Sequence, residues 1–233
     1  MEQKKLTASK SANGKIFLPG SKSITNRVLL MSALSNGETL VENYLNSDDT
    51  QQMLNALKNL KVQYKVVQNK HILIKGCNHN LPNKNANLFL GNAGTAFRPL
   101  TAVLALMRGE YYLEGVKRMH ERPIKDLVDA LTQIGAKINY TNNLGYPPLK
   151  ILPGNIQCDE NIKIKGNVSS QFLTALLIAG PLCNQNLKIQ IIGKLVSKPY
   201  IDITLKLLAQ FGIKYKNEEW KKFILKAPSR FKG

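Results

Sequence analysis

The sequence predicts an α/β domain in which three copies of one unit close around a pseudo-threefold axis, with helices inside and sheets outside. The first observation is a repeated pattern: an amphipathic helix ends, Gly or Lys follows, and a strand begins, at residues 56–64, 130–138 and 207–215. The second is a Gly beside a small polar residue ahead of an apolar helix, at Gly20, Gly91 and Gly166. These glycines are spaced by 71 and 75 residues, and the first pattern by 74 and 77. Such a period indicates one supersecondary unit copied within the chain.

Each unit is predicted to run strand, glycine turn, helix, strand, helix, strand. Apolar runs predict the first helices, at 27–34, 99–106 and 172–179. Alternating apolar and polar residues predict the strands that follow them, at 37–43, 109–115 and 186–193, and a closing strand near 222–226. Two Asn-rich stretches predict loops, at 78–87 and 140–148. The resulting boundaries are a leading strand within 1–18, three units at about 19–75, 88–150 and 162–226, and a tail at 227–233.

The charge balance allows two interpretations. The 233 residues include 33 Lys and Arg against 15 Asp and Glu, a formal charge of +18. A Lys- and Asn-rich composition spread over solvated faces explains this excess, and so does an anionic ligand. The basic residues form no single stripe, and no nucleic-acid-binding motif is present, so we expect no nucleic-acid partner. A small, multiply charged metabolite fits a scattered excess better.

Other residue types narrow the class of protein further. Cys77, Cys158 and Cys183 are odd in number and lack metal-ligand spacing, and the three histidines are dispersed, so we expect no metal site. The N-terminal stretch has no apolar core typical of a secretory signal, and no apolar run is long enough to span a bilayer. We therefore expect a cytoplasmic protein without a membrane partner.

The first glycine turn, LPGSKSITNR at 18–27, is predicted to bind an anion. A helix N-terminus exposes unpaired N–H groups and partial positive charge. Lys22 adds a compact positive charge there, and Arg27 adds a planar fork that matches phosphate or carboxylate. The alternative for this segment is a serine cap with two surface cations.

Four further turns resemble the first in chemistry. Gly91 and Gly94 allow close backbone approach to a ligand. Ser169, Ser170 and Gln171 gather polar groups ahead of the third apolar helix, where plain capping is the alternative. The remaining two turns place cations or hydroxyls just before a proline that starts a helix, and contain Arg122, Ser197 and Lys198.

Five segments together resemble the EPSP synthase family of enolpyruvyl transferases (3-phosphoshikimate 1-carboxyvinyltransferases). They are LPGSKSITNR (18–27), LFLGNAGTAFRPL (88–100), ERPI (121–124), NVSSQFLTALL (167–177) and LVSKPYIDITL (195–205). They occur in the family's order, and the similarity runs from about residue 16 to residue 213. The resemblance implies the family's inside-out α/β barrel, a role in the shikimate pathway of aromatic amino acid biosynthesis, and no cofactor.

The resemblance also implies which residues bind each substrate. The shikimate 3-phosphate ligands would be Lys22, Ser23, Arg27, Ser169, Ser170, Gln171, Ser197 and Tyr200. The phosphoenolpyruvate ligands would be Lys22, Gly94, Arg122 and Gln171. Lys22 is the one catalytic residue expected here, through stabilisation of transition-state charge. The implied reaction adds the shikimate hydroxyl to phosphoenolpyruvate and then eliminates phosphate.

Family members have two similar domains, and the general acid, the general base and further phosphoenolpyruvate ligands belong to the second. The resemblance therefore implies that this chain supplies one wall of the active site and is inactive unless the other domain is supplied in trans. The alternative is a truncated, non-catalytic half that binds phosphoshikimate. The related UDP-N-acetylglucosamine enolpyruvyl transferases fit less well, because they have Lys-Asn at Lys22-Ser23 and a reactive Cys shortly before Arg122, where residues 115–120 contain none.

Overall fold

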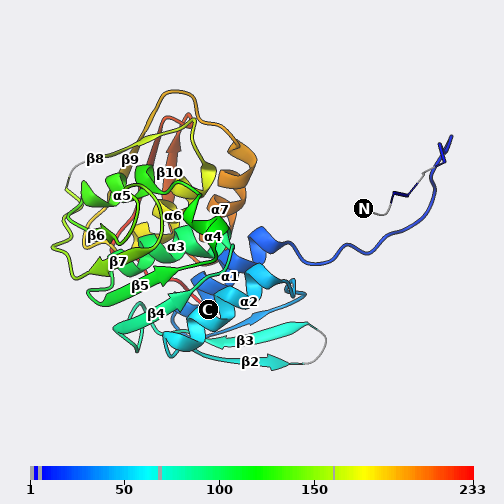
Figure 1. The fold of residues 1–233 in the computed structure, drawn as a ribbon, viewed down its shortest axis with the longest axis horizontal. Coiled ribbons are helices and arrows are strands. Elements are labelled where there is room, and N and C mark those ends of the chain that lie inside the picture. The colour runs from blue at the N-terminus through cyan, green and yellow to red at the C-terminus, as the bar shows by residue number, and fades with distance from the viewer. Residues whose placement is uncertain (1–2, 5–6, 68–69, 160) are drawn as a thin grey trace.

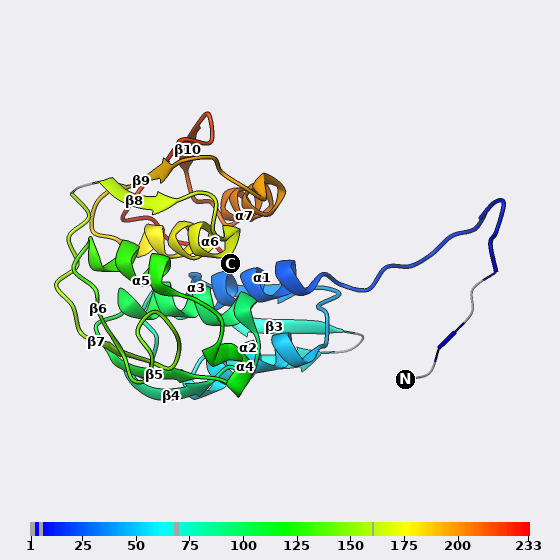
Figure 2. The same cartoon turned by 45° about the horizontal axis from the view of Figure 1, so that its top comes forward.

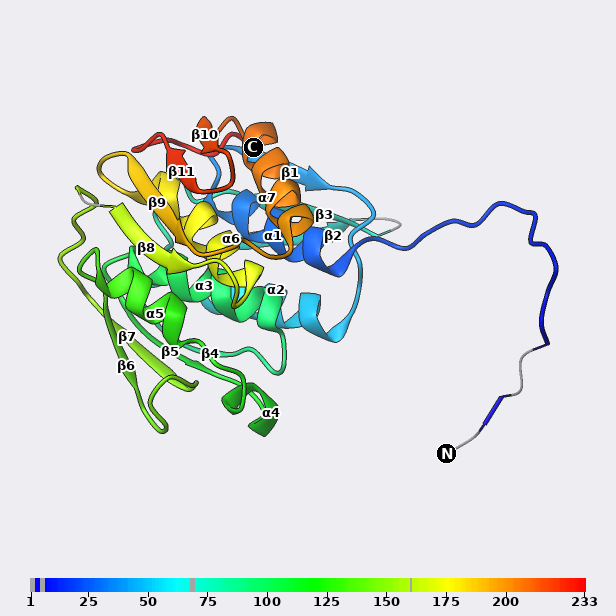
Figure 3. The ribbon, with the colours of Figure 1, turned by 90° about the horizontal axis from the view of Figure 1, so that it is seen from above.

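Three β-sheets surround a group of helices in the computed structural model, which describes residues 3–4, 7–67, 70–159 and 161–233 (Figure 1). Viewed from above, the helices lie between the sheets (Figure 3). The first unit contains α1 (Lys22–Leu34), β1 (Glu38–Val41), α2 (Asp48–Asn59), β2 (Gln63–Val67) and β3 (His71–Lys75). Its sheet has the order β1-β3-β2, with antiparallel pairs throughout. The predicted arrangement of helices inside and sheets outside is confirmed.

The second and third units resemble each other in the order of their elements, and each begins with a strand ahead of its first helix. The second contains β4 (Asn85–Phe89), α3 (Gly94–Ala105), β5 (Glu110–Glu114), α4 (Lys117–His120), α5 (Lys125–Thr132), β6 (Lys137–Tyr140) and β7 (Leu149–Leu152). The third contains β8 (Asn161–Lys165), α6 (Ser170–Ala179), the 3-10 turn η1 (Gly180–Leu182), β9 (Leu187–Ile192), α7 (Lys198–Gln210), β10 (Tyr215–Glu218) and β11 (Lys222–Leu225). Their sheets are β4-β5-β7-β6 and β8-β9-β11-β10, in which only the β4–β5 and β8–β9 pairs are parallel.

The observed unit differs from the predicted one by an additional strand. After its second helix each unit forms a hairpin, β2–β3, β6–β7 or β10–β11. The predicted unit has one strand at this place, and only in the third unit does a second predicted strand, near 222–226, coincide with the hairpin's second strand, β11. The predicted loop at 78–87 is also wrong at its end, because β4 begins at Asn85. Ala86 and Leu88 are buried while their Asn neighbours are exposed, so the strand alternation was present within an Asn-rich composition.

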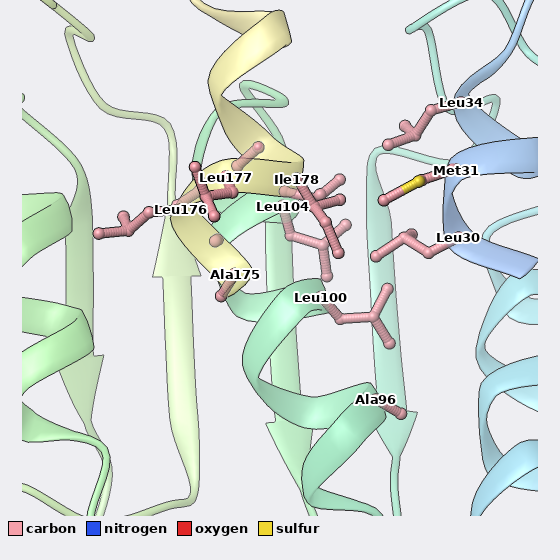
Figure 4. Packing of buried hydrophobic residues seen from close by; sticks show 14 of the residues in the cluster. Leu30, Met31, Leu34, Ala96, Leu100, Leu104, Ala175, Leu176, Leu177 and Ile178 are labelled. Carbon is pink, nitrogen blue, oxygen red and sulfur yellow. The ribbon is translucent and has the colours of Figure 1, made fainter. Parts of the chain in front are cut away.

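The core lies between α1, α3 and α6. Three residues mark this core: Leu30 of α1, Leu100 of α3 and Ile178 of α6. All three are fully buried and lie between these helices (Figure 4). Helix α3 packs against both α6 and α1. A helix that is apolar on every side is stable only where it is buried, and every residue of α6 from Phe172 to Ala179 is buried. None of the helices within the described ranges is both long and apolar enough to cross a bilayer.

The two ends of the chain are packed differently. Residues 7–20 contain no helix or strand and run away from the domain as an exposed segment (Figures 1 and 2); Phe17 is 98% exposed. The leading strand predicted within 1–18 is therefore not formed here, and residues 1–2 and 5–6 of it lie outside the described residues. By contrast, Phe231 in the predicted tail is fully buried, and Lys232 forms a parallel bridge with Asn36, just before β1. Apart from this bridge, no described strand lies on the edge of β1 that faces away from β3.

Candidate active site at the helix N-termini

Arg27 joins the N-terminal parts of three helices. It lies in α1, is 4% exposed, and donates from Nη1 to the carbonyl oxygen of Ser23 (2.7 Å). It also donates from Nε to Oγ1 of Thr204 in α7 (2.9 Å) and from Nη2 to Oγ1 of Thr174 in α6 (3.2 Å). Burial lowers the pKa of Arg27 to about 10, and the nearby Tyr200 opposes this effect. Arg27 remains a cation at neutral pH and holds α1, α6 and α7 together.

The predicted phosphoshikimate residues lie on these same three helix starts. Ser23 and Arg27 are in the first two turns of α1, Ser170 and Gln171 begin α6, and Tyr200 is in the first turn of α7. Ser169 caps α6, because its Oγ accepts a hydrogen bond from the N–H of Gln171 (3.2 Å), as the capping alternative expects. The O–H of Ser169 is still able to donate a hydrogen bond to a ligand. Ser197 precedes α7 in the left-handed region, with φ of 55°. The backbone at Ser197 is thus in a conformation that non-glycine residues adopt at a cost.

Lys22, at the first position of α1, faces a carboxylate. Its Nζ lies 3.2 Å from Oδ2 of Asp49, in the first turn of α2, and its side chain is 47% exposed. Asp49 lines a polar cavity of about 420 Å³ together with Asp48, Gln52, Phe89, Gly91, Asn92, Ala93 and Val116. An acidic group near a helix N-terminus is favourable for the helix, and here it also holds the ammonium of Lys22 at the cavity's edge.

Arg122 contacts another residue that lines the same cavity, Asn92. Its Nη1 donates to the main-chain oxygen (2.8 Å) and the side-chain Oδ1 (3.1 Å) of Asn92. The guanidinium lies so close to the start of α3 that a Cβ added to Gly94 would overlap its Nη2. Gly94 is therefore the residue type that this position accommodates. Lys22 and Arg122 are not in direct contact, but their partners Asp49 and Asn92 line one cavity.

A second arginine stands behind Arg122. Arg98 of α3 is 3% exposed, donates from Nη1 to Sδ of Met119 (3.2 Å) and from Nη2 to the carbonyl oxygen of Pro123 (3.3 Å). Its Nε is buried and has no hydrogen-bond partner among the described residues. Burial, and secondly the charge of Arg122, lower the pKa of Arg98 to about 9. Two cations therefore lie side by side at the start of α3.

The structure thus brings the predicted residues into two neighbouring groups. The first group, on α1, α6 and α7, contains Ser23, Arg27, Ser169, Ser170, Gln171, Ser197 and Tyr200. The second, around the cavity, contains Lys22, Gly94 and Arg122. Asn26 of α1 connects them by donating to Oγ1 of Thr95 at the start of α3 (2.7 Å).

Sequence reasoning missed the residues that hold these groups in place. Asp49 lies in the first turn of α2, after the cap Ser47, where an acidic residue is expected because it stabilises the helix. Nothing in the residues around it indicates that it pairs with Lys22. Arg98 interrupts an otherwise apolar helix, and that interruption is a signal that sequence reasoning had available. In the sequence, Thr174 and Thr204 look like ordinary threonines of apolar helices. Their Oγ1 atoms nevertheless accept hydrogen bonds from Arg27 and lie 3.1 Å from each other.

Known proteins are similar to this chain in sequence and in fold. A family model described as EPSP synthase (3-phosphoshikimate 1-carboxyvinyltransferase) matches residues 6–233. The 3-phosphoshikimate 1-carboxyvinyltransferase of Cupriavidus necator is 52% identical over 236 residues, covering 100% of this chain and 54% of that protein. The protein of the same name from Ralstonia pickettii is 53% identical, covering 97% of this chain and 52% of that protein.

A solved structure agrees with these relatives. The structure of EPSP synthase from Acinetobacter baumannii matches with a TM-score of 0.81 and 25% sequence identity, over 94% of this chain and 48% of that chain. The chain spans about half the length of the curated relatives it matches. Because the family model covers nearly the whole chain and the three sheets enclose the helices as in that fold, the chain belongs to the EPSP synthase family.

Proposed function

We propose that this chain forms one wall of the active site that transfers the enolpyruvyl group of phosphoenolpyruvate to shikimate 3-phosphate. The products are 5-enolpyruvylshikimate 3-phosphate and phosphate. The observation that carries the proposal is the pair of adjacent cationic groups at helix N-termini, one organised by Arg27 and the other around Lys22 and Arg122. Two substrates that both carry phosphate and carboxylate require two such groups at one site.

Shikimate 3-phosphate is assigned to the group on α1, α6 and α7. Its ligands would be Lys22, Ser23, Arg27, Ser169, Ser170, Gln171, Ser197 and Tyr200. Phosphoenolpyruvate is assigned to the neighbouring group, with Lys22, Gly94, Arg122 and Gln171 as ligands. Lys22 is assigned to both substrates and is the residue that would stabilise negative charge developing on phosphoenolpyruvate as the new bond forms and phosphate leaves.

The Asp49 carboxylate gives the proposal a specific requirement. In the structure it neutralises Lys22 at 3.2 Å. A phosphate that binds Lys22 must compete with this carboxylate or share the ammonium with it, and Lys has three N–H donors for such sharing. Asp49 would then orient Lys22 between the two substrates.

Titration of shikimate 3-phosphate into the 233-residue chain, followed by calorimetry, tests the binding part. Lys22→Ala is expected to weaken binding about tenfold or more, because it removes a charge-assisted bond to phosphate. Lys58→Ala, which changes an exposed lysine near the end of α2, is the matched control and should leave binding unchanged. Equal affinities of Lys22→Ala and the unsubstituted chain would contradict the assignment.

The complementing domain is a separate part of the proposal. Ile16, Phe17 and Leu18 are 81%, 98% and 74% exposed, which suits a leading segment that packs on another domain. Phosphate release should be absent for the chain alone and appear when the C-terminal half of a relative is added. Steady release by the chain alone would contradict the incomplete-wall proposal. Binding without release in the mixture would favour the alternative, a non-catalytic half.

A further inference from the structure

The buried Arg98 is the feature that the proposed function leaves unexplained. It is 3% exposed, and no ion pair among the described residues includes either Arg98 or Arg122. An uncompensated buried cation costs free energy, so buried charges are normally paired. A second cation beside it increases that cost. A purely structural role would be filled at lower cost by an apolar side chain of similar volume.

Geometry connects Arg98 to Arg122 in two ways. The two donated hydrogen bonds of Arg98 go to Met119, within α4, and to Pro123, directly after Arg122 in the turn that follows α4. The guanidinium groups also converge at the start of α3, where a Cβ added to Gly94 would overlap Arg122 and lie 2.9 Å from Nη1 of Arg98. Arg98 thus supports the turn that carries Arg122 and places a second guanidinium group beside it.

We propose that Arg98 is a positioning residue for Arg122, which fixes its turn and supplies a second positive charge, so that one bound anion is the counter-ion of both arginines. The anion would be the phosphate or carboxylate group of phosphoenolpyruvate, and this step rests on the proposed role of Arg122. Without the anion, the two guanidinium groups repel each other. With it, the attraction of both groups to the anion outweighs their mutual repulsion, and the ligand stabilises the start of α3 and the turn together.

Binding measurements test the support that Arg98 gives to the ligand. Phosphoenolpyruvate is titrated into the chain and into Arg98→Met, Arg98→Lys and, as matched control, Arg118→Met, an exposed arginine on α4 that pairs with Glu121. Arg98→Met is expected to bind about tenfold more weakly, with a shallower dependence of affinity on salt. Arg98→Lys keeps the charge and should recover part of the affinity and the steep salt dependence. Arg118→Met should bind as the unsubstituted chain does.

Thermal unfolding without any ligand tests the charge coupling independently. Arg122→Gln removes the charge and Arg122→Lys keeps it, while both lose the fork that holds Asn92. The Tm of Arg122→Gln should exceed that of Arg122→Lys by a few degrees, on the order of 3 °C. In the Arg98→Met background, or the Arg98→Gln background if Arg98→Met does not fold, this difference should vanish.

The outcomes separate the inference from the function on which it rests. If a folded Arg98→Met chain binds phosphoenolpyruvate with unchanged affinity and salt dependence, the inference is wrong. It is also wrong if the Tm difference between the two Arg122 variants is absent or does not depend on Arg98. If the unsubstituted chain does not bind phosphoenolpyruvate while the Tm coupling is present, the assignment of phosphoenolpyruvate to Arg122 fails and the coupled pair of cations stands.

Discussion

Arg27 uses three of its five N–H groups within the protein, on Ser23, Thr174 and Thr204, and two remain for a ligand. Arg27→Met should therefore reduce stability as well as binding. We expect a loss of about 2–4 kcal/mol in the free energy of unfolding, because three bonds from a cation disappear, two of which join α1 to α6 and α7. Urea unfolding measures this loss, and Arg118→Met, at an exposed site, should cost less than about 0.5 kcal/mol. Equal stability of the two variants would show that the network does not hold the helices.

His79 should make stability depend on pH. Burial, and secondly the charge of Arg230, lower its pKa from 6.5 to about 4, and its neutral Nε2 accepts the N–H of Phe231 (3.3 Å). Between pH 6.5 and pH 4 the unfolded chain binds the proton more readily, so stability should fall as the pH falls through this window. Comparing the Tm at pH 7 and pH 4.5 tests this, and the fall should be smaller in His79→Gln, whose amide oxygen does not titrate.

At the level of single residues, the sequence indicated the helix starts where anion-binding residues are expected, but not the side chains that hold these helix starts in place. Lys22, Arg27 and Ser169–Gln171 stand at helix starts next to glycine turns, where chain-local chemistry indicates an anion site. Their partners come from distant positions: Thr204 is 177 residues from Arg27, and Arg98 reaches the turn at Pro123. Such pairings depend on how helices cross, and no local pattern contains that information.

Among the elements, α3 is the one on which the packing most depends, since it lies between α1 and α6. Leu100→Ala should cost about 2–5 kcal/mol, because Leu100 is fully buried between these helices and the cavity left behind cannot easily collapse. Denaturant unfolding gives the value. Leu144→Ala, at a side chain that is 75% exposed, is the control and should change stability by less than about 0.5 kcal/mol. A similar cost at both positions would contradict the core described above.

The helices were predictable from the sequence and the hairpins were only partly so. A long apolar run such as 172–179 forms a helix that is buried along its whole length. The composition of the run is therefore enough to predict a buried helix. In the β6–β7 hairpin the strands are 4 residues each and are separated by a turn-rich stretch, so each shows only two alternations. A pattern that short does not distinguish one strand from two, and it is pairing across the sheet that fixes both.

For the molecule as a whole, the two ends of the chain should contribute very differently to stability. Phe17 is 98% exposed, whereas Phe231 is fully buried and contacts His79 and Phe211 edge-on. Phe231→Ala should cost about 3–5 kcal/mol and Phe17→Ala less than about 0.5 kcal/mol. Because the residue type is the same, equilibrium unfolding of the two variants compares the ends directly. A large effect of Phe17→Ala would mean that the leading segment packs on the domain.

The unpaired edge of β1 has a colloidal consequence. In the other two sheets β4 and β8 cover this edge, but among the described residues β1 meets only the bridge from Lys232 there, and Leu40 within β1 is 52% exposed. Unused N–H and C=O groups along a strand are a template on which another molecule can pair. Light scattering should therefore show association that increases with protein concentration, and Leu40→Lys should shift its onset to higher concentration. Ile192→Lys, at a similarly exposed residue of β9, which has a strand on each side, is the control. The protein concentration at which molecules begin to associate should thus depend on this one short strand as well as on the stability of the core.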